Sequence, residues 1–322
     1  MATIDTMSLS KSALKQSRLL KYAPLLPSAA RRFARLDTCR RYLLTALVLV
    51  VILIGCAMIP PFVRHQNNDL RVREIAVSSD RIVSGQAVRI AHLSDLHSKQ
   101  FGQGNSELLA KIQSLEPDLI VNTGDTLHQS GDYYEEIVTF FGQLTDIAPT
   151  VSVMGNHEPR TGKRADFIRD LQAEGIHFLD NEFLQLDIGG TPVSLLGIDE
   201  RYFDRLDSRA HELLLQELSE MSGLRVVLSH YPNEFSLIEE DRAWNRFDFE
   251  LMFAGHAHGG QWIVPGIGGL FAPEQWLFPV QYRGLYENRL VLSPGLGNSH
   301  FPLRLNNFPE IMLVEVGPAS TD

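Results

Sequence analysis

Two residues able to hold a metal ion or move a proton, Asp95 and His97, directly follow the apolar stretch 88–93. Side chains two residues apart on extended chain point to the same side. A carboxylate and an imidazole would therefore share one face where a strand ends, which is where α/β sheets place their chemistry. One Asp-x-His pair is a weak signal, so its meaning depends on partners elsewhere in the chain.

Four further apolar stretches end in polar loops of the same kind. These loops contribute Asp125, Asn156 with His157, His230, and His256 with His258. In an α/β fold such strand ends converge on one edge. Carboxylate, amide and imidazole groups together suit Zn, Mn or Fe better than Ca or Mg. The set is too large for one ion, whereas two ions about 3.5–4 Å apart, sharing a carboxylate and a hydroxide, would use all of it.

Cysteine use and charge restrict the alternatives. Cys39 and Cys56 both precede Pro60, so the body has no thiolate ligand and no internal disulfide. The 322-residue chain has a net charge of −10, but residues 1–41 hold nine Lys/Arg and two Asp. The body keeps 20 basic and 37 acidic residues. Such an acidic body predicts no nucleic-acid partner, because phosphates need a basic surface, and it tolerates bound cations.

An uncharged stretch, residues 42–63, follows the basic segment 1–41. As a helix it would extend about 33 Å, enough to cross the hydrocarbon layer. The excess of arginine before it predicts a single-pass protein of the cell membrane, with a disordered cytoplasmic tail (1–41), an anchor (42–63) and an extracytoplasmic body. Pro60 and Pro61 are expected to end the span. A twin-arginine export signal and a lipoprotein modified at Cys56 are alternatives to an uncleaved anchor.

The body alternates apolar strands with helices. Strands are expected at 70–77, 88–93, 118–122, 150–154, 183–187, 193–198, 225–228, 249–253, 290–292 and 311–316, and helices near 108–115, 132–143, 162–174 and 207–221. The order strand, polar loop, helix predicts the α/β class, and the later hairpin-like strands predict a mixed sheet. No repeat or internal linker divides it, so we expect one catalytic domain, residues 68–317.

In their order along the chain, the five polar loops resemble the calcineurin-like metallophosphoesterase superfamily. The matching blocks are Asp95-x-His97, Gly124-Asp125, Gly155-Asn156-His157-Glu158, His230 and Gly255-His256-x-His258. The run 259–261 and the segment 295–311 resemble its bacterial membrane-anchored branch, which includes phosphodiesterases and relatives of UDP-diacylglucosamine pyrophosphatase. The resemblance covers about residues 68–316. Residues 98–100 depart from it, because many relatives have a glycine there, which affects the substrate rim but not the ligands.

The resemblance implies a four-layer α/β/β/α sandwich with two metal ions. It assigns one ion to Asp95, His97 and His258 and the other to Asn156, His230 and His256, with Asp125 bridging them. A hydroxide between the ions would attack phosphorus, and His157 would stabilise the transition state or protonate the leaving group. His300 and Arg304, in the C-terminal motif, are candidates for substrate contact.

Other polar and aromatic residues have less specific expectations. His92 is expected to be structural, His128 to lie outside the site and His211 to face solvent. Glu158 has two interpretations, a support behind the ligands or a charge at a helix N-terminus. The loop 262–286 is rich in aromatic residues and follows the last histidines directly. It is expected either to fold onto the core or to contact acyl chains or the bilayer surface.

These observations predict a membrane-anchored, dinuclear-metal phosphoesterase that hydrolyses phosphodiester or pyrophosphate bonds, on lipid or lipid-linked substrates. Within enzymes, the alternative is a broad-specificity phosphomonoesterase or phosphodiesterase for soluble substrates. From a different class, the alternative is a metal-binding surface scaffold without turnover. An extracytoplasmic body does not suit UDP-linked sugars, which are cytoplasmic, so the substrate is less well defined than the reaction.

Overall fold

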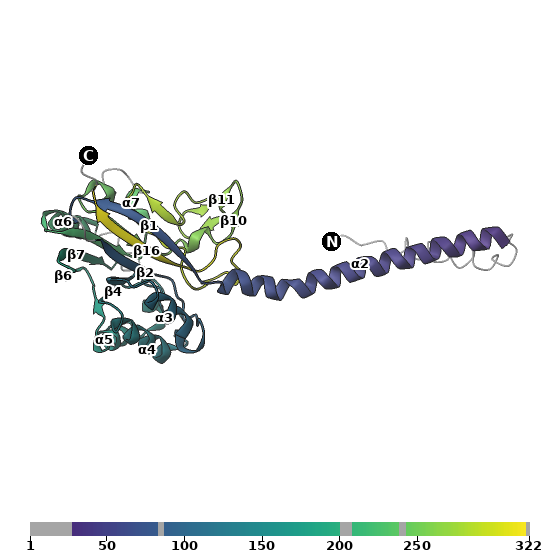
Figure 1. Ribbon diagram of the computed structural model, residues 1–322, viewed down its shortest axis with the longest axis horizontal. Coiled ribbons are helices and arrows are strands. Elements are labelled where there is room, and N and C mark those ends of the chain that lie inside the picture. The colour runs from purple at the N-terminus through teal and green to yellow at the C-terminus, as the bar shows by residue number, and fades with distance from the viewer. Residues whose placement is uncertain (1–27, 83–86, 200–207, 238–242, 320–322) are drawn as a thin grey trace, which may run out of the picture. The chain divides into compact units, whose positions relative to one another are not determined.

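The computed structural model describes residues 28–82, 87–199, 208–237 and 243–319 (Figure 1). The chain divides into two compact units, Met1–Phe62 and Val63–Asp322. The described part of the first unit begins with a long helix. The second unit contains two six-stranded sheets and all of the candidate site residues. We call the second unit the body.

One helix, α2 (Ser28–Asn68), runs through the basic segment, the uncharged stretch and both prolines. Residues 28–41 are therefore helical rather than a disordered tail, in keeping with their alanine, arginine and leucine content. The expected tail over residues 1–27 lies outside the described residues. Pro60 and Pro61 do not end the helix, because proline's fixed φ is compatible with it and the lost bonds concern only two carbonyls one turn earlier.

The part of α2 from Arg40 to Asn68 is long and apolar enough to cross a membrane, with a mean hydropathy of 2.8 over its most apolar window. It is the one helix in the described part of the chain that meets this condition. Its side chains over residues 40–62 are exposed or nearly so. This apolar, unburied surface is what a lipid environment would cover.

The described residues of the body form two mixed six-stranded sheets, besides two short hairpins. The first has the order β1-β16-β2-β3-β4-β5 and the second β14-β15-β9-β8-β7-β6. The first sheet consists of β1 (Arg71–Ser79), β16 (Glu310–Pro318), β2 (Val88–Leu93), β3 (Leu119–Asn122), β4 (Thr150–Ser152) and β5 (His177–Phe178). The second consists of β14 (Gly284–Tyr286), β15 (Leu290–Leu292), β9 (Leu251–Ala254), β8 (Leu224–Ser229), β7 (Thr191–Ile198) and β6 (Glu182–Ile188). The expected mixed sheet is thus confirmed as two.

Strand direction explains the mixture. In the first sheet β2, β3, β4 and β5 run parallel, while β16 is antiparallel to β2 and parallel to β1. In the second sheet β7, β8, β9 and β15 are parallel, and β6 and β14 pair antiparallel at the two edges. The parallel central strands read as continuous apolar runs because both of their faces are buried.

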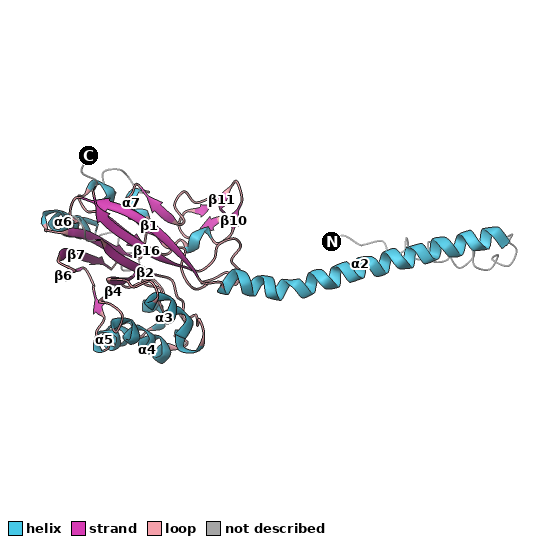
Figure 2. Cartoon of the chain, in the orientation of Figure 1, coloured by secondary structure: helices cyan, strands magenta, loops and turns pink. Residues whose placement is uncertain are grey.

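Three hydrophobic cores separate four layers. Helices α3 (Ser106–Gln113), α4 (Tyr134–Thr145) and α5 (Arg164–Ala173) pack on one face of the first sheet, as Figure 2 shows. The second core lies between the two sheets, and the third lies between the second sheet and helices α6 (Ser208–Glu220) and α7 (Asn233–Ser236). Side chains of alternate parity along β2 fill different cores: Ala91 and Leu93 face the helices, and Ile90 faces the other sheet. The expected α/β/β/α sandwich is confirmed.

Two short hairpins follow the last histidines of the site. The first joins β10 (Ile263–Val264) to β11 (Gly268–Gly269), and the second joins β12 (Phe271–Ala272) to β13 (Trp276–Leu277). Both belong to the aromatic loop expected between 262 and 286. The turns of 3₁₀ helix are η2 (Gln103–Asn105), η3 (Glu158–Thr161), η5 (Trp244–Arg246) and η6 (His258–Gly260).

Candidate metal centre and active site

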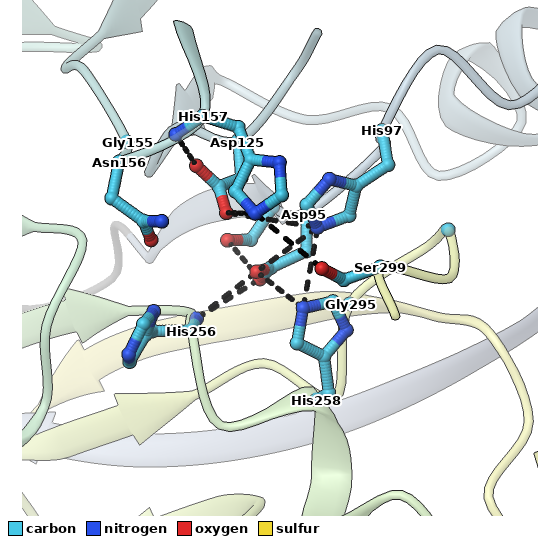
Figure 3. Close-up of polar contacts among 12 residues, drawn as sticks. Asp95, His97, Asp125, Gly155, Asn156, His157, His256, His258, Gly295 and Ser299 are labelled. Atoms are coloured by element: carbon cyan, nitrogen blue, oxygen red, sulfur yellow. Dashed lines mark hydrogen bonds and ion pairs between the residues drawn. The ribbon is translucent and has the colours of Figure 1, made fainter. Parts of the chain in front are cut away.

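The candidate residues come from loops at the carboxyl ends of five strands, three in one sheet and two in the other. β2, β3 and β4 lead to Asp95, Asp125 and Asn156, while β8 and β9 lead to His230 and His256. The loops are tied to each other by backbone bonds, such as that from the amide of Asp95 to the carbonyl oxygen of Gly124 (2.9 Å). The amide of His256 donates to Asp95 Oδ1 (3.1 Å), which joins the two sheets at the site (Figure 3).

Left-handed backbone is concentrated in these loops. Five candidate ligands have φ between +46° and +67°, namely Asp95, His97, Asp125, His256 and His258. Such values are uncommon for residues other than glycine and persist where the surrounding structure enforces them. The sharp turns direct successive polar side chains toward the same point, so the strained backbone brings the candidate ligands together.

Glycine is required at two points of close approach. A Cβ on Gly155 would overlap the amide and a carboxylate oxygen of Asp125, and a Cβ on Gly255 would overlap Ser94 and a carboxylate oxygen of Asp95. The glycine that precedes Asn156 and the glycine that precedes His256 therefore let one loop pass directly over the carboxylate of another.

One group of converging ligand atoms consists of Asp95, His97 and His258, all buried. The Nε2 atoms of the two histidines are 3.2 Å apart. Asp95 Oδ1 lies 3.4 Å from Nε2 of His258 and 4.0 Å from Nε2 of His97. Figure 3 shows the three side chains pointing toward one another.

A second group surrounds His230. Its Nε2 lies 3.1 Å from Asn156 Oδ1, 3.1 Å from Nδ1 of His256 and 3.4 Å from Asp125 Oδ2. The same Asp125 oxygen is 3.6 Å from Nε2 of His97, which belongs to the first group. Asp125 therefore stands between the two groups and is in reach of both.

Hydrogen bonding in the second group tests whether a cation fits. His230 Nδ1 donates to the carbonyl oxygen of Thr123 (2.8 Å), which leaves the lone pair of a neutral Nε2 directed at the centre. There it faces a carboxylate oxygen and an amide oxygen, both acceptors. Acceptors gathered at such distances repel unless a cation or an extra proton lies among them. The donor set thus fits a divalent metal ion.

The acid–base balance of the metal-free centre leads to the same conclusion. Burial lowers the pKa of His97 and of His256 well below the usual range. Burial also lowers the pKa of His230, but the charge and hydrogen bond of Asp125, the charge of Asp95 and the bond to Thr123 together outweigh it and raise that pKa to about 10. Although burial raises the pKa of Asp125, the charge and hydrogen bond of His230 hold it well below its usual range. A proton on His230 thus takes the position of positive charge that a metal ion would supply.

Glu158 supports the loops from behind. Its buried carboxylate accepts the amides of Leu127 (3.1 Å) and Gly155 (3.0 Å), and also those of Thr126 and Asp125. Burial, with the charge of Asp125, raises the pKa of Glu158 to about 7. Of the two interpretations, a support behind the ligands is the one that the structure bears out, although Glu158 also begins η3.

A buried relay of hydrogen bonds ends at Asp95. Ser94 Oγ donates to Asp95 Oδ2 (2.6 Å), and Thr123 Oγ1 donates to Ser94 Oγ (2.8 Å). Since the Thr123 hydroxyl proton is used, Nε2 of His92 must donate to Thr123 Oγ1 (2.8 Å). His92 also packs edge-on against Phe253. Its expected structural role agrees with this placement.

A pocket of about 360 Å³ opens over the candidate ligands. Its polar residues are Asp125, Asn156, His157, Arg160, His256, His258, Gln261, Ser299 and His300, and its apolar residues are Phe271, Pro273 and Phe301. Nε2 of His157 lies 3.4 Å from Ser299 Oγ and 3.9 Å from Asp125 Oδ2. Burial lowers the pKa of His157 to about 4, so near neutral pH the ring is uncharged and can donate one hydrogen bond.

The structure brings together all seven expected ligands and His157, but it separates the two expected substrate contacts. His300 lines the pocket. Arg304 is fully buried beneath it, donating to the carbonyl oxygens of Pro294 (2.8 Å) and Gly297 (2.5 Å). Its guanidinium holds the loop in place and is not among the pocket residues, so the expectation of substrate contact does not fit its position.

Two other histidines lie outside the group of candidate ligands. His128 bonds to Ser130 and is not among the pocket residues, as expected. His211 was expected to face solvent; it is half-buried and lies edge-on to Trp244.

The pocket also contains Arg160 and Ser299, which sequence reasoning did not single out. Arg160 lies four residues after Asn156 in the same polar loop, a signal that was available; Ser299 had none beyond its place in the C-terminal motif.

The fold and this site define a metal-dependent phosphoesterase. The chain belongs to the calcineurin-like phosphoesterase family, which it matches over residues 88–260. It is 25% identical over 269 residues to the uncharacterized metallophosphoesterase YkoQ of Bacillus subtilis, covering 80% of this chain and 95% of that protein. It is 28% identical over 234 residues to the phosphodiesterase YaeI of Escherichia coli, covering 71% and 82%.

A third relative is larger. The transmembrane protein with metallophosphoesterase domain of Bos taurus is 25% identical over 252 residues, covering 73% of this chain and 54% of that protein. Family and relatives together make the chain a metal-dependent hydrolase of phosphoric esters. Its clustered histidines and aspartates are suited to divalent metal ions.

Proposed function

We propose that this chain is a membrane-anchored phosphoesterase that uses two divalent or trivalent metal ions, Mn, Fe or Zn, to hydrolyse phosphodiester or pyrophosphate bonds of lipid or lipid-linked substrates. The observation that carries the proposal is a pocket with converging metal-ligand atoms on one side and an apolar wall on the other. Such a pocket suits a molecule that has a phosphoryl group at one end and an apolar group at the other.

Two cations are supported by the division of the ligands. One ion would be held by Asp95, His97 and His258, and the other by Asn156, His230 and His256. Asp125 would be shared, since its Oδ2 lies 3.4 Å from His230 Nε2 and 3.6 Å from His97 Nε2. Seven ligand side chains exceed what one ion of the first transition row takes.

The reaction follows from the charges around the pocket. Two bound cations would neutralise phosphoryl oxygens and acidify the water that attacks phosphorus. His157, buried and neutral, is placed at the pocket to donate its Nε2–H to an oxygen of the reacting phosphoryl group or to the leaving oxygen. Arg160 adds a cationic side chain at the same pocket, where it would attract an anionic substrate.

Membrane anchoring is supported by the exposed apolar helix from Arg40 to Asn68. We infer a basic cytoplasmic segment over residues 1–41, an anchor over 42–63 and an extracytoplasmic catalytic domain over 68–317, from the arginine excess before the span. The apolar wall formed by Phe271, Pro273 and Phe301 supports an acyl or other apolar group next to the scissile bond.

The reaction is tested on the full-length chain in detergent, loaded with Mn²⁺. We expect hydrolysis of bis(p-nitrophenyl) phosphate by the wild type, and a loss of at least about a hundredfold in Asp125→Asn. His128→Ala is the matched control, because His128 is near the site but not in the pocket. Equal rates in wild type and Asp125→Asn would contradict the proposal.

The substrate class is tested by comparing lipid pyrophosphates, lipid phosphodiesters and monoesters with their short-chain analogues, all dispersed in the same detergent. A lipid substrate predicts a kcat/KM that is higher for the long-chain compound at equal headgroup. Equal or lower values for every long-chain compound would limit the proposal to soluble substrates.

A further inference from the structure

Five large apolar side chains are exposed in a short stretch of the body. Their exposed fractions are 63% for Ile267, 72% for Trp276, 69% for Leu277, 61% for Phe278 and 74% for Val280. We call them the hairpin surface, since they lie on and after the β10–β11 and β12–β13 hairpins. In the described part of the body, five of the eight exposed large apolar residues belong to it. Such clustering marks a contact surface rather than scattered exposure.

The outward pose of this surface is built into the backbone. Residues of β12 pair with β13, and the amide of Phe278 donates to the carbonyl oxygen of Leu270 (3.0 Å). The side chain of Gln275 accepts the amides of Val280 (3.0 Å) and Gln281 (3.1 Å) and donates to the carbonyl oxygen of Gln281 (2.6 Å). The apolar side chains are therefore held outward by a closed set of hydrogen bonds.

The same hairpin forms one wall of the candidate active site. Phe271 and Pro273 line the pocket, and the ring of Phe271 lies 5.5 Å from that of Phe301 on the opposite loop. Phe271 also lies 6.3 Å, edge to face, from the exposed ring of Trp276. Phe271 thus contacts both the pocket and the hairpin surface.

The hairpins are also connected to the last turn of α2, residues 63–68, which belongs to the body. Gln66 is buried and its Oε1 accepts the amide of Asn306 (2.6 Å). Asn306 Nδ2 in turn donates to the carbonyl oxygen of Ile263 in β10 (3.1 Å). Figure 1 shows β10 and β11 on the side of the body where this last turn lies.

A second set of bonds fixes the same junction. The side chain of Asn67 accepts the amide of Arg304 (2.9 Å) and donates to the carbonyl oxygen of Pro302 (2.7 Å). The amide of Ile263 donates to the carbonyl oxygen of Leu305 (2.8 Å). If residues 42–63 lie in a bilayer, the last turn of α2 is at its surface, and this network holds the hairpins close to that surface.

We propose that the hairpin surface inserts into the lipid bilayer that holds α2, so that the pocket opens toward lipid headgroups. The proposal rests on the membrane anchoring proposed above. The occupant is the bilayer, because the surface combines a tryptophan with aliphatic and phenyl side chains and is joined by hydrogen bonds to the end of the apolar helix. Tryptophan favours the headgroup level of a membrane, and Phe and Leu are typical of apolar surfaces that enter the interface.

The experiment uses the full-length chain in nanodiscs whose lipids carry brominated acyl chains, which quench nearby tryptophan. Trp244→Phe and Trp262→Phe leave Trp276 as the single tryptophan. The matched control carries all three Trp→Phe changes and Leu213→Trp, since Leu213 is 60% exposed on α6. Both proteins must hydrolyse bis(p-nitrophenyl) phosphate like the wild type, which shows that they are folded.

We expect several-fold stronger quenching of Trp276 than of the Leu213→Trp reporter, and protection of Trp276 from aqueous iodide. Equal quenching of the two reporters would overturn the proposal. Because quenching needs no turnover, an inactive wild type whose reporter variant is still quenched and has the wild-type melting temperature would refute the proposed function and not the surface. A chain that does not stay with the nanodiscs would refute the anchor itself, and the surface proposal with it.

A functional arm compares substrates in the same nanodiscs. Trp276→Ser with Phe278→Ser is expected to lower, about tenfold, the hydrolysis of a long-chain alkyl p-nitrophenyl phosphate, while the rate with bis(p-nitrophenyl) phosphate is unchanged. Leu213→Ser should change neither rate. Equal losses on both compounds would show a defect of the site rather than of membrane contact and would count against the proposal.

Discussion

His157 is the residue whose position best separates a working enzyme from a metal-binding scaffold. It lines the pocket and belongs to neither of the two ligand groups described above, although its ring also converges with His97 and Asp125. We expect His157→Ala to lower kcat by about 10²–10⁴ while the metal content stays that of the wild type. His128→Ala, the neighbour outside the pocket, should retain nearly full activity. Steady-state kinetics with metal analysis checks this, and unchanged kcat in His157→Ala would exclude a role in the chemistry.

Glu158 supports the site through hydrogen bonds to four backbone amides. In Glu158→Gln, one oxygen becomes an amide donor that faces backbone N–H groups, so two acceptor contacts become donor–donor contacts. We expect a destabilisation of about 2–4 kcal/mol and weaker metal binding. Denaturant unfolding and metal titration measure both. Glu182→Gln, an exposed glutamate on β6, is the control, and equal stability of the two variants would contradict the support role.

Residue types and spacing in the sequence were sufficient to predict which seven candidate ligands converge, but not how their neighbours are placed. Each ligand follows a local apolar run, so its place at a strand end is encoded within about ten residues. Arg304 does not follow such an apolar run. Its direction depends on the carbonyl oxygens of Pro294 and Gly297, which reach it only through the turn of their loop. Long-range backbone paths of this kind have no counterpart in motif spacing.

Strand β2 carries a histidine that is buried between the sheets. Burial lowers the pKa of His92 to about 3, from the 6.5 of an exposed histidine. Below pH 6.5 His92 is therefore protonated in the unfolded chain but stays neutral in the folded chain. The stability that depends on neutral His92 is complete above pH 6.5 and falls as pH decreases toward 3, by up to about 1.4 kcal/mol per pH unit.

His92→Gln should remove this dependence. The variant is expected to be less stable than the wild type near neutral pH, because it loses packing against Phe253. As pH falls below 6.5 the difference should narrow, since only the wild type has the histidine to protonate. Denaturant unfolding of the metal-free proteins over a pH series measures the two curves. Parallel curves would show that His92 titrates normally in the fold.

At the scale of elements, the sheets were easier to predict than the helix. Parallel strands buried on both faces are continuous apolar runs, and all of the expected strands are present. The helix is longer than predicted at both ends, because residues 28–41 are helical rather than disordered and because Pro60 and Pro61 do not end it. Proline removes two hydrogen bonds but keeps a helical φ, so the outcome depends on the rest of the helix.

In the whole molecule, loops from both six-stranded sheets meet at one cluster of candidate metal ligands, which makes metal binding and folding depend on each other. Ligands from both sheets converge there, so a cation bound to the folded chain stabilises the sandwich as a unit. At a free metal concentration of a hundred times Kd, one such site adds about 2.7 kcal/mol to the unfolding free energy. We expect a chelator to lower the melting temperature of the wild type and to have little effect on Asp125→Asn.

Metal binding should also release protons, in a number set by the charges of the centre. The low pKa values of His97, His256 and His258 mean that they are already neutral near pH 7. His230, with a pKa of about 10, still holds a proton that a cation must displace. The apparent affinity should therefore rise about tenfold per pH unit between about pH 6 and pH 8, with release of close to one proton. Calorimetric titration in buffers of different ionisation enthalpy counts that proton, and an affinity independent of pH would show that Asp125 and His230 do not share it.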